Sequence, residues 1–529
     1  MATAALRRIG PLVVIAVLAL ALKVALLAAD AVPFNSDEAI VALMARHILQ
    51  GERPAFFYGQ AYMGSLDAFL IAGACTLMGE SVLAVRVVQV VLFLAVLLTG
   101  YAVALRLTGS QRVALLTALL FAFPPVLLTL YTTATLGGYG EAMLVGNLLL
   151  WWGHRLGYED IHRKRLWLAW GLVAGLGFWA LGLTLVYLVP VALWLLWRGR
   201  ARPWREYSVA VLGFAFGSLP WWLGNLGRVG IAFAELSGDA VKSTATAGSL
   251  FGNVGMRVFN FIVLGLPALF GLRFPWSIEG PPLWLAAPTL ALYLGALIFP
   301  KARSFREDGI LLWGVCATLF LGFVLTPFGG DPSGRYFLPL YLPLFIFTAQ
   351  ALAALRERIG QWAWALLGIV LIFNLVGIVQ AALKNPPGIT TQFEEITQVD
   401  HRYDAELIRF LRERGQTRGY GNYWVAYPIA FLSNEEIILA PHLPYKADLR
   451  YTYRDDRYPP YTQAVEQAAN VVYVTTNHPK LDALLRARFE ALGVDFREAQ
   501  IGSYHVFYSL SRKVTPEKLG GAGFSQSAN

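Results

Sequence analysis

Long apolar segments alternate with short polar connections over the first 384 residues of the chain. Each long segment approaches the roughly 20 apolar residues that a helix needs to cross the hydrocarbon core of a bilayer. The pattern therefore predicts a polytopic helical membrane protein with about eleven spans, by this length criterion. The predicted spans lie near 11–29, 82–107, 113–130, 141–156, 207–225, 283–299, 309–326, 336–354 and 361–382, with two more inside 166–197.

Basic residues between the apolar segments indicate which way the spans run. Arg106 and Arg112 fall on the same side as the cluster 162–165 if the intervening segments cross the membrane, as the positive-inside rule requires. The stretch 166–197 has basic residues at both flanks, so we expect two short crossings with a turn near 177–182. This places the N-terminus in the cytoplasm. Three connections lie on the outer face: 30–81, 131–140 and 226–282.

The N-terminal apolar segment has an alternative interpretation as a cleaved signal peptide. Arg7 and Arg8 precede it, and small residues follow it at 28–31. The segment is about a full membrane span long, and cleavage would detach the acidic loop that follows from its anchor. We therefore expect residues 1–384 to form one transmembrane domain.

A second domain begins where Asn385-Pro386-Pro387-Gly388 ends the last apolar helix. The composition becomes charged and mixed from there, which predicts a soluble α/β domain over 385–512 on the extracytoplasmic side. We expect a Gly/Ser-rich disordered tail over 513–529. The expected helices are 405–414 and 480–492, the expected strands are 436–439 and 471–475, and the expected closing hairpin joins 495–500 to 504–510.

Composition excludes several classes of protein. The chain is 57% hydrophobic and only 15% charged, with a mean hydropathy of +0.53, so it is not a soluble globule. Its net charge of +9 resides in short clusters between apolar segments, which indicates membrane topology and no nucleic-acid partner. Cys75 and Cys316 both lie in apolar segments, so neither a disulfide framework nor a thiolate metal site is predicted.

An adjacent acidic pair, Asp37 and Glu38, follows the first predicted span. Asn35 and Glu38 have the spacing of a helix capping box, which would explain the pair on structural grounds alone. Polar and aromatic side chains return later in the same loop, and a purely structural hairpin does not require them. These residues are Tyr58, Gln60, Tyr62 and Asp67. We therefore expect Asp37 and Glu38 to be catalytic and Tyr58, Gln60 and Tyr62 to bind substrate.

The second outer loop delivers Tyr139 and Glu141 to the start of a span. Glu141 also suits the positive end of a helix dipole, which is the structural alternative. The paired glycines 137 and 138 beside Tyr139 favour close approach of the backbone to a bound molecule. We expect Glu141 to join the catalytic set and Tyr139 to bind substrate.

Cations on the outer face form a third candidate group. A turn over 328–334 delivers Arg335 and Tyr336 to the mouth of a span, and Lys242 and Arg257 lie in the connection 226–282. An arginine there can simply extend to lipid headgroups. Its planar guanidinium also suits bidentate contact with a phosphate, so we expect these four residues to bind substrate.

These motifs resemble the GT-C superfamily of membrane glycosyltransferases, in particular the branch of protein O-mannosyltransferases and lipid A aminoarabinose transferases. The resemblance rests on Asp37-Glu38, the stretch 59–64, Glu141 and the stretch 335–339, in that order and with matching sidedness. It implies inverting transfer of a sugar from a polyprenyl-phosphate carrier to an acceptor hydroxyl at the extracytoplasmic face. Asp37 matches the catalytic acid of the first loop, while Glu141 stands where some relatives have Asp.

Residue chemistry agrees with that expectation. A hydroxyl that attacks an anomeric carbon needs a general base, and Asp37 can serve. The phosphate leaving group needs only a cation, for which Arg335, Arg257 or Lys242 is available. One alternative is a transporter or flippase of lipid-linked sugars, but the sequence shows neither the paired charges near the membrane midplane nor the two related halves that are typical of transporters. A second alternative is a glycan receptor.

Whether catalysis needs a metal ion depends on how much charge the phosphate of the lipid carrier bears. Asp37, Glu38 and Glu141 could converge on Mg²⁺ or Mn²⁺, as hard oxygen ligands do. A monophosphate carries little charge and an arginine can hold it, so we predict that no metal or other cofactor is required. The expected partners are the lipid-linked donor, membrane lipid, and the hydroxyl of a glycan, lipid or protein. The expected location is the inner membrane of the bacterial cell envelope.

Overall fold

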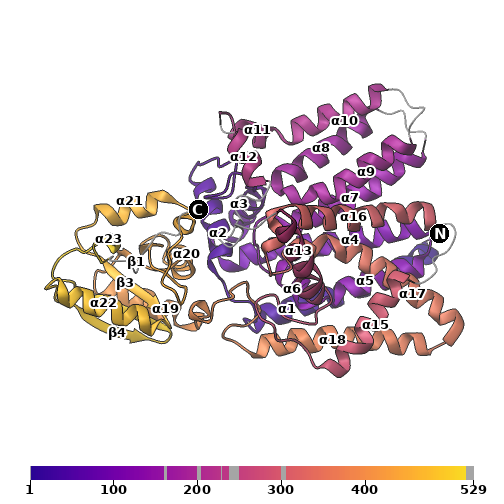
Figure 1. The fold of residues 1–529 in the computed structure, drawn as a ribbon. Coiled ribbons are helices and arrows are strands. Elements are labelled where there is room, and N and C mark those ends of the chain that lie inside the picture. Colours follow the sequence, from indigo (N-terminus) through magenta and orange to yellow (C-terminus); the bar gives the residue numbers. More distant parts are fainter. Residues whose placement is uncertain are drawn as a thin grey trace.

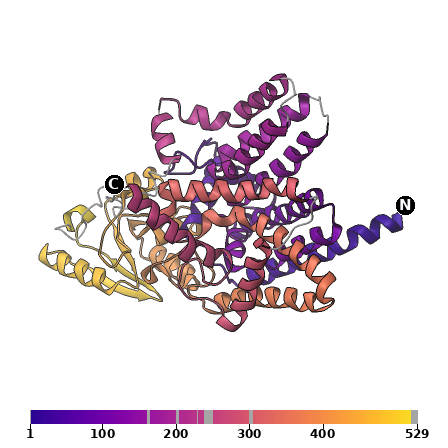
Figure 2. The same ribbon diagram turned by 45° about the vertical axis from the view of Figure 1, so that its right-hand side comes forward.

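The computed structural model describes residues 2–159, 164–198, 204–227, 229–236, 250–298 and 305–519. Most of them form helices that run alongside one another, which we call the helical part (residues 2–383). The residues from 385 on form the C-terminal part, which contains a β-sheet and lies at one end of the helices (Figure 1). The N-terminus lies at the opposite end, and a second view shows the same arrangement (Figure 2).

The helical part begins with a long helix, two shorter ones and a second long helix. These are α1 (Ala2–Ala28), α2 (Ser36–Leu49), α3 (Leu66–Met78) and α4 (Val82–Thr108). The next are α5 (Gln111–Ala122), α6 (Val126–Tyr131), α7 (Tyr139–Tyr158), α8 (Lys164–Ala180), η1 (Gly182–Thr184), α9 (Leu185–Arg198), α10 (Trp204–Gly217), α11 (Leu219–Gly224) and α12 (Val229–Leu236). The last are α13 (Leu250–Asn260), η3 (Phe261–Gly265), α14 (Leu266–Leu269), α15 (Leu283–Ile298), α16 (Phe305–Leu325), η4 (Pro327–Gly330), η5 (Arg335–Leu340), α17 (Tyr341–Ile359) and α18 (Trp362–Leu383).

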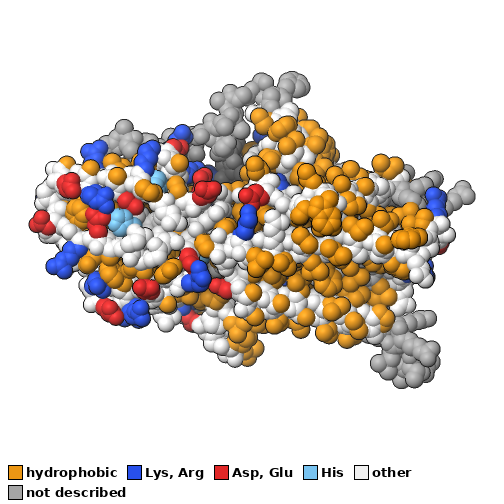
Figure 3. All heavy atoms as spheres, turned by 90° about the horizontal axis from the view of Figure 1, so that it is seen from below, with side chains coloured by type: hydrophobic (Ala, Val, Ile, Leu, Met, Phe, Trp, Pro, Cys, Tyr) orange, Lys and Arg blue, Asp and Glu red, His pale blue; other side chains and the backbone are white. Residues whose placement is uncertain are grey.

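The surface of the helical part is apolar, whereas charged side chains gather over the C-terminal part (Figure 3). Five described helical segments are long and apolar enough to cross a membrane: 10–28, 82–108, 308–325, 335–359 and 362–383. Their outward apolar side chains suit lipid rather than water. The chain is therefore an integral membrane protein, and the count of eleven crossings stays a prediction.

The predicted segments 166–197 and 113–130 are each divided between two helices. The break expected inside 166–197 is present, because α8 ends at Ala180 and α9 begins at Leu185. The span expected over 113–130 was wrong as a single helix, since α5 ends at Ala122 and α6 begins at Val126. Pro124 and Pro125 lie between them, and a proline has no N–H to continue the helical hydrogen bonds.

Glycines bring α8 and α10 into close contact. A Cβ at any of four glycines would lie only 2.0–2.2 Å from a backbone oxygen of the other helix. These residues are Gly171 and Gly175 on α8 and Gly213 and Gly217 on α10. The spacing of four on both helices is the small-residue pattern that lets membrane helices pack backbone to backbone.

Charged helix ends converge on the side away from the C-terminal part. Arg106 of α4 pairs with Glu159, just after α7, with 3.0 Å between Nη2 and Oε1. Arg198 at the end of α9 donates a hydrogen bond to the Tyr158 hydroxyl at the end of α7. The basic ends of three helices thus meet, as the topology prediction requires, although the direction across the membrane stays a prediction.

The C-terminal part contains a five-stranded sheet of order β2-β1-β3-β5-β4. Its strands are β1 (Arg418–Tyr420), β2 (Ile438–Ala440), β3 (Val472–Thr476), β4 (Arg497–Ile501) and β5 (Tyr504–Tyr508). Strand β1 runs parallel to β2 and β3, and β5 runs antiparallel to β3 and β4. The helices are α19 (Asp404–Glu413), α20 (Tyr423–Leu432), α21 (Pro459–Gln467), α22 (Pro479–Ala491) and α23 (Pro516–Leu519). The elements β1, α20 and α21 have no counterpart in the sequence prediction.

The prediction of a disordered tail from residue 513 does not hold for the first residues of that tail. Val514 and Leu519 are buried, and the Tyr473 hydroxyl donates a 2.8 Å hydrogen bond to the Val514 carbonyl. Residues 513–519 therefore pack on the C-terminal part. Residues 520–529 lie outside the described residues.

Candidate active site

A polar cavity of about 610 Å³ lies where the outer loops of the helical part meet the C-terminal part. The lining residues come from the first turn of α2 and the loop after it, the loop before α7, α12, the segment before α15, the turn before η5 and several segments of the C-terminal part. Among the residues predicted to form the site, five line this cavity: Asp37, Gln60, Tyr62, Tyr139 and Arg335. Loops far apart in the sequence therefore supply a single site.

Asp37 projects from the first turn of α2 into this cavity. Its Oδ1 accepts a 2.6 Å hydrogen bond from the Tyr423 hydroxyl, and its Oδ2 accepts a 3.3 Å hydrogen bond from the Thr391 hydroxyl. The capping interpretation of this turn also holds, because the Asn35 side chain accepts from the Glu38 amide. Asn35 performs the capping, so the Asp37 carboxylate remains available to the cavity.

Glu38 does not line the cavity, contrary to the prediction that it stands beside Asp37 at one site. Its side chain is 0% exposed, and its Oε2 lies 2.5 Å from Nη2 of Arg86. The same guanidinium nitrogen donates a 3.1 Å hydrogen bond to the Val32 carbonyl. Consecutive residues of a helix point about 100° apart, as 3.6 residues per turn require, so Glu38 and Asp37 face different surroundings. Glu38 anchors α2 to α4.

Glu141 is likewise buried away from the cavity, contrary to the prediction. Its carboxyl is a neighbour of the Asp67 carboxyl. Asp67 accepts hydrogen bonds from the Thr135 hydroxyl and from Gln89 Nε2, the latter at 3.2 Å. The two carboxyl groups and these donors connect α3, α4 and α7, so they hold the helices together.

Arg335 lies at the start of η5 and lines the cavity. Its Nη2 is 2.5 Å from the Asp331 carboxylate, and its Cζ is 5.1 Å from the centre of the Tyr336 ring. Within the described part of the chain, its buried Nε has no hydrogen-bond partner. Because Arg335 lines the cavity, its guanidinium group suits an anionic ligand there.

An apolar cavity of about 200 Å³ adjoins the polar one. The two share Tyr62, Met63 and Tyr139 in their linings, and Tyr336 lines the apolar cavity. Its other walls are mainly Leu, Val and Phe side chains of the α8–α9 connection, α9 and α16. Arg335, which stacks on Tyr336, therefore stands at the junction of a polar and an apolar chamber.

The remaining predicted substrate-binding residues lie elsewhere. Tyr58 hydrogen-bonds with His47 at 2.8 Å and donates to Glu52 at 2.7 Å, outside both cavities. Arg257 donates a 3.3 Å hydrogen bond to the Val324 carbonyl and lines neither cavity. Lys242 lies outside the described residues. Contact of Tyr58 and Arg257 with substrate therefore stays a prediction.

Residues of the C-terminal part complete the cavity, and the sequence analysis missed them. Tyr423 supplies the hydrogen bond to Asp37, and Arg457 lines the wall beside it. Asp455 also lines the wall, and burial raises its pKa to about 7, although the positive charges of Arg457 and Lys446 oppose the shift. The run 454–457, Arg-Asp-Asp-Arg, was the available signal, but nothing local places it near Asp37.

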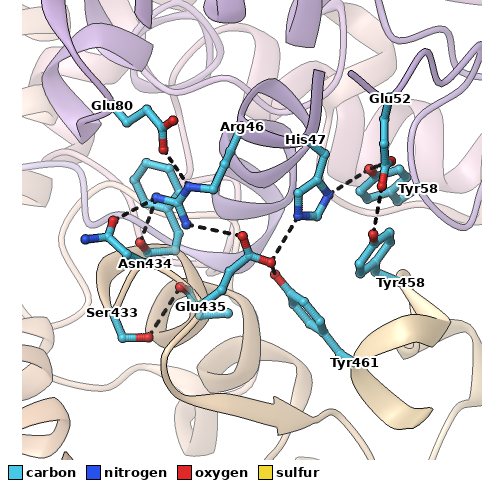
Figure 4. A network of polar contacts seen from close by, with 12 residues as sticks. Arg46, His47, Glu52, Tyr58, Glu80, Ser433, Asn434, Glu435, Tyr458 and Tyr461 are labelled. Carbon is cyan, nitrogen blue, oxygen red and sulfur yellow. Dashed lines mark hydrogen bonds and ion pairs between the residues drawn. The ribbon is translucent and has the colours of Figure 1, made fainter. Parts of the chain in front are cut away.

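A polar network holds the C-terminal part against α2 and the loop that follows it (Figure 4). Glu435 accepts from the Tyr461 hydroxyl at 2.8 Å, lies 3.1 Å from His47 Nε2, and is 3.8 Å from Arg46 Nη1. Arg46 also donates to the Phe431 carbonyl at 3.2 Å. Because α2 carries both Asp37 and the network residues Arg46 and His47, this contact sets the position of the C-terminal part over the cavity.

The cavity thus combines several carboxyl groups, that of Asp37 among them, with the guanidinium groups of Arg335, Arg454 and Arg457 and with several aromatic rings. Across the described ranges, no three His, Cys, Asp or Glu side chains are grouped so that they could hold a metal ion. This set suits base-assisted attack by a hydroxyl and stabilisation of a departing anion.

Comparisons with known proteins identify chains of similar fold. A family model described as dolichyl-phosphate-mannose-protein mannosyltransferase matches residues 65–223. Among solved structures, the chain is similar to ArnT from Cupriavidus metallidurans bound to undecaprenyl phosphate, with a TM-score of 0.61 and 13% identity over 95% of this chain and 98% of that one. For ArnT in the apo state, the TM-score is 0.54 at 14% identity, over 89% of this chain and 92% of that one.

A further structural match is the oligosaccharyltransferase of Archaeoglobus fulgidus, in complex with Zn and sulfate, with a TM-score of 0.49 and 14% identity over 88% of this chain and 67% of that one. A search of curated proteins finds no significant match. The resemblance to GT-C glycosyltransferases is confirmed, and at these identities what it shows is the fold.

Proposed function

We propose that this protein is an inverting glycosyltransferase that moves a sugar from a polyprenyl-phosphate carrier to an acceptor hydroxyl at the extracytoplasmic face of the membrane. The observation that carries the proposal is the junction at Arg335. There, a polar cavity containing Asp37 shares three wall residues with an apolar cavity in the helical part. A lipid-linked sugar has its groups in the same order: an apolar tail for the apolar cavity, a phosphate for the junction and a sugar for the polar cavity.

The donor fits along this axis. The first part of its apolar chain would occupy the cavity between α9 and α16, and its phosphate would contact the guanidinium group of Arg335 at the junction. Asp331 partly neutralises Arg335, which suits a ligand of single charge. The sugar then extends into the polar cavity towards Asp37. The similarity to an ArnT structure that holds undecaprenyl phosphate supports this class of donor.

The reaction needs one base and one anion-binding group. Asp37 takes the proton of the acceptor hydroxyl as the acceptor oxygen bonds to the anomeric carbon. The bond between that carbon and the phosphate oxygen breaks, and the phosphate keeps the electron pair. Arg335 stabilises the departing phosphate. Attack opposite to the leaving group inverts the anomeric centre.

No residue in this scheme calls for a metal ion. Asp37, Glu38 and Glu141 do not converge, and the guanidinium of Arg335 supplies the positive charge that a monophosphate needs. We therefore propose metal-independent transfer. We also propose that the C-terminal part lies outside the cytoplasm and the N-terminus inside it, in a bacterial inner membrane.

The test is a transfer assay with purified full-length protein in sealed proteoliposomes. Undecaprenyl-phosphate-linked radiolabelled hexoses and pentoses are offered together with detergent-extracted cell-envelope material. We expect label to leave the lipid for acceptor with wild-type protein and the rate to fall by about 10²-fold or more in Arg335→Gln. Transbilayer movement of an intact lipid-linked sugar, without loss of its sugar, would instead indicate a flippase and contradict the proposal.

A further inference from the structure

The polar cavity has a second end that the donor does not use. In an inverting displacement the acceptor hydroxyl and the leaving phosphate lie on opposite faces of the sugar, so the acceptor lies beside the base. Asp37 and Arg457 line this end together, and the Tyr423 ring touches both: its hydroxyl donates to Asp37 at 2.6 Å, and its centre is 5.9 Å from Arg457 Cζ. Arg457 therefore lies beside the base, on the acceptor side of the cavity.

Arg457 is held ready for a ligand. Burial by itself lowers its pKa, but the neighbouring Tyr423 and Asp37 outweigh that effect and raise it, so the guanidinium stays charged. Among the residues that the structure describes, its buried Nε has no hydrogen-bond partner. Gly59 packs directly on its stem, since a Cβ at Gly59 would lie 2.9 Å from Arg457 Cδ. Because Arg457 lines the cavity, its charged guanidinium can donate hydrogen bonds to a ligand there.

Aromatic and acidic side chains of the C-terminal part surround Arg457. Trp424, Tyr445 and Tyr453 line the same end of the cavity, and Trp424 and Tyr445 meet at 6.4 Å between ring centres. Asp455 and Asp456 line it as well. Carboxylates accept hydrogen bonds and a guanidinium donates them, so the set matches hydroxyl groups, which do both.

This chemistry discriminates between classes of acceptor. Carboxyl groups outnumber guanidinium groups in the lining, since Asp37, Glu235, Asp331, Asp455 and Asp456 accompany Arg335, Arg454 and Arg457, so the cavity disfavours an anionic acceptor. A lipid acceptor would need an apolar chamber at this end, but no residue of the C-terminal part lines the apolar cavity. An extended polypeptide that adds to a strand edge would find none here, because none of β1 to β5 lines the polar cavity.

We propose that the end of the cavity formed by Trp424, Tyr445 and Arg457 is the acceptor subsite and that the acceptor is a neutral saccharide. This inference rests on the proposed transfer reaction and names its acceptor class. The aromatic rings support the apolar faces of the sugar rings, Arg457 and Asp455 hydrogen-bond with their hydroxyl groups, and the reacting hydroxyl points at Asp37.

The experiment measures acceptor and donor binding separately on the full-length protein in detergent. Saturation-transfer NMR records binding of neutral trisaccharides of glucose, mannose, galactose and N-acetylglucosamine, and of a pentapeptide containing Ser and Thr. Native mass spectrometry records binding of undecaprenyl phosphate. The variants are Arg457→Gln and Trp424→Ala, and the control is Arg450→Gln, an exposed arginine of the same domain outside the cavity.

We expect at least one trisaccharide to bind the wild type and the control. We expect its affinity to fall about tenfold or more in both variants while undecaprenyl phosphate binding is unchanged, since each variant removes about 1.4 kcal/mol or more. Binding of the pentapeptide alone, or of no probe, overturns the saccharide assignment. Loss of undecaprenyl phosphate binding in Arg457→Gln would instead assign Arg457 to the donor. A wild type that does not bind undecaprenyl phosphate contradicts the proposed function itself.

Discussion

Replacement of Asp37 by Asn separates catalysis from structure at this site. The amide has nearly the same shape, and its oxygen can still accept from the Tyr423 hydroxyl at 2.6 Å. Its NH₂ group then faces the Thr391 hydroxyl, 3.3 Å away, which can rotate to accept. We therefore expect the free energy of unfolding to change by less than about 1 kcal/mol. The amide cannot take a proton, so we expect kcat to fall about 10²- to 10⁴-fold, or about 3–5 kcal/mol.

The assay is transfer of label from the active undecaprenyl-phosphate sugar under saturating donor, with the melting temperature measured on the same preparation. Tyr423→Phe is the matched control, because it keeps the carboxylate and removes one hydrogen bond. We expect it to cost about 1 kcal/mol, or roughly fivefold in rate. Asp37→Asn protein that retains more than a tenth of wild-type turnover would refute the assignment of Asp37 as the base.

Four further predictions follow from other parts of the structure. Glu38→Gln leaves Arg86 buried without its charge partner, and we expect it to lower the free energy of unfolding by about 3–5 kcal/mol. The measurement is unfolding in SDS, in which the double variant Glu38→Leu with Arg86→Met should recover most of this loss. Because burial raises the pKa of Asp455 to about 7, the folded protein binds more protons than the unfolded chain between about pH 4 and 7, and its stability falls as pH rises through that window. Asp455→Asn should flatten the melting temperature against pH there; an unchanged slope would contradict the shift. Glu435→Gln loosens the contact with His47, and we expect transfer to fall about tenfold because the site is displaced, with undecaprenyl phosphate binding retained. Exhaustive EDTA treatment should leave turnover intact, whereas loss restored by Mn²⁺ or Mg²⁺ would show that a metal is needed.

The part of the site that the sequence predicts is the part contributed by the helical bundle. Asp37, Tyr139 and Arg335 each follow or begin an apolar helix at the same end of the bundle. Alternation of spans brings such residues to one face of the membrane without any knowledge of side-chain packing. The cavity contains all three, so sidedness alone was enough to gather them.

Side-chain direction within that face could not be predicted from the pattern. Glu38 and Glu141 occupy the same level as Asp37, yet each points into a contact between helices. Their partners are Arg86 and Asp67, and the sequence distance to them carries no signal of contact. An acidic residue in the first turn of a helix suits the dipole whichever way it faces, so its residue type does not reveal its role.

The contribution of the C-terminal part was also beyond the sequence. Tyr423 lies 386 positions from Asp37, and Arg457 lies 398 positions from its contact Gly59. The strand β1 that precedes α20 has only three residues, too few for alternation of apolar positions to show. Without β1 and α20 in the predicted topology, no rule of periodicity directs Tyr423 at the membrane loops.

The hydrogen bonds of Asp37 make the C-terminal part integral to catalysis in the proposed scheme. Both groups that hold its carboxylate, the Thr391 and Tyr423 hydroxyls, lie beyond the last helix of the helical part. A base held by two fixed donors is oriented before the acceptor arrives, so less of the binding energy goes into arranging it. The C-terminal part sits on α2 through Arg46 and His47, and α2 carries Asp37 itself. Displacement of the C-terminal part would therefore remove the acceptor subsite and the orientation of the base together, and donor binding at Arg335 would remain.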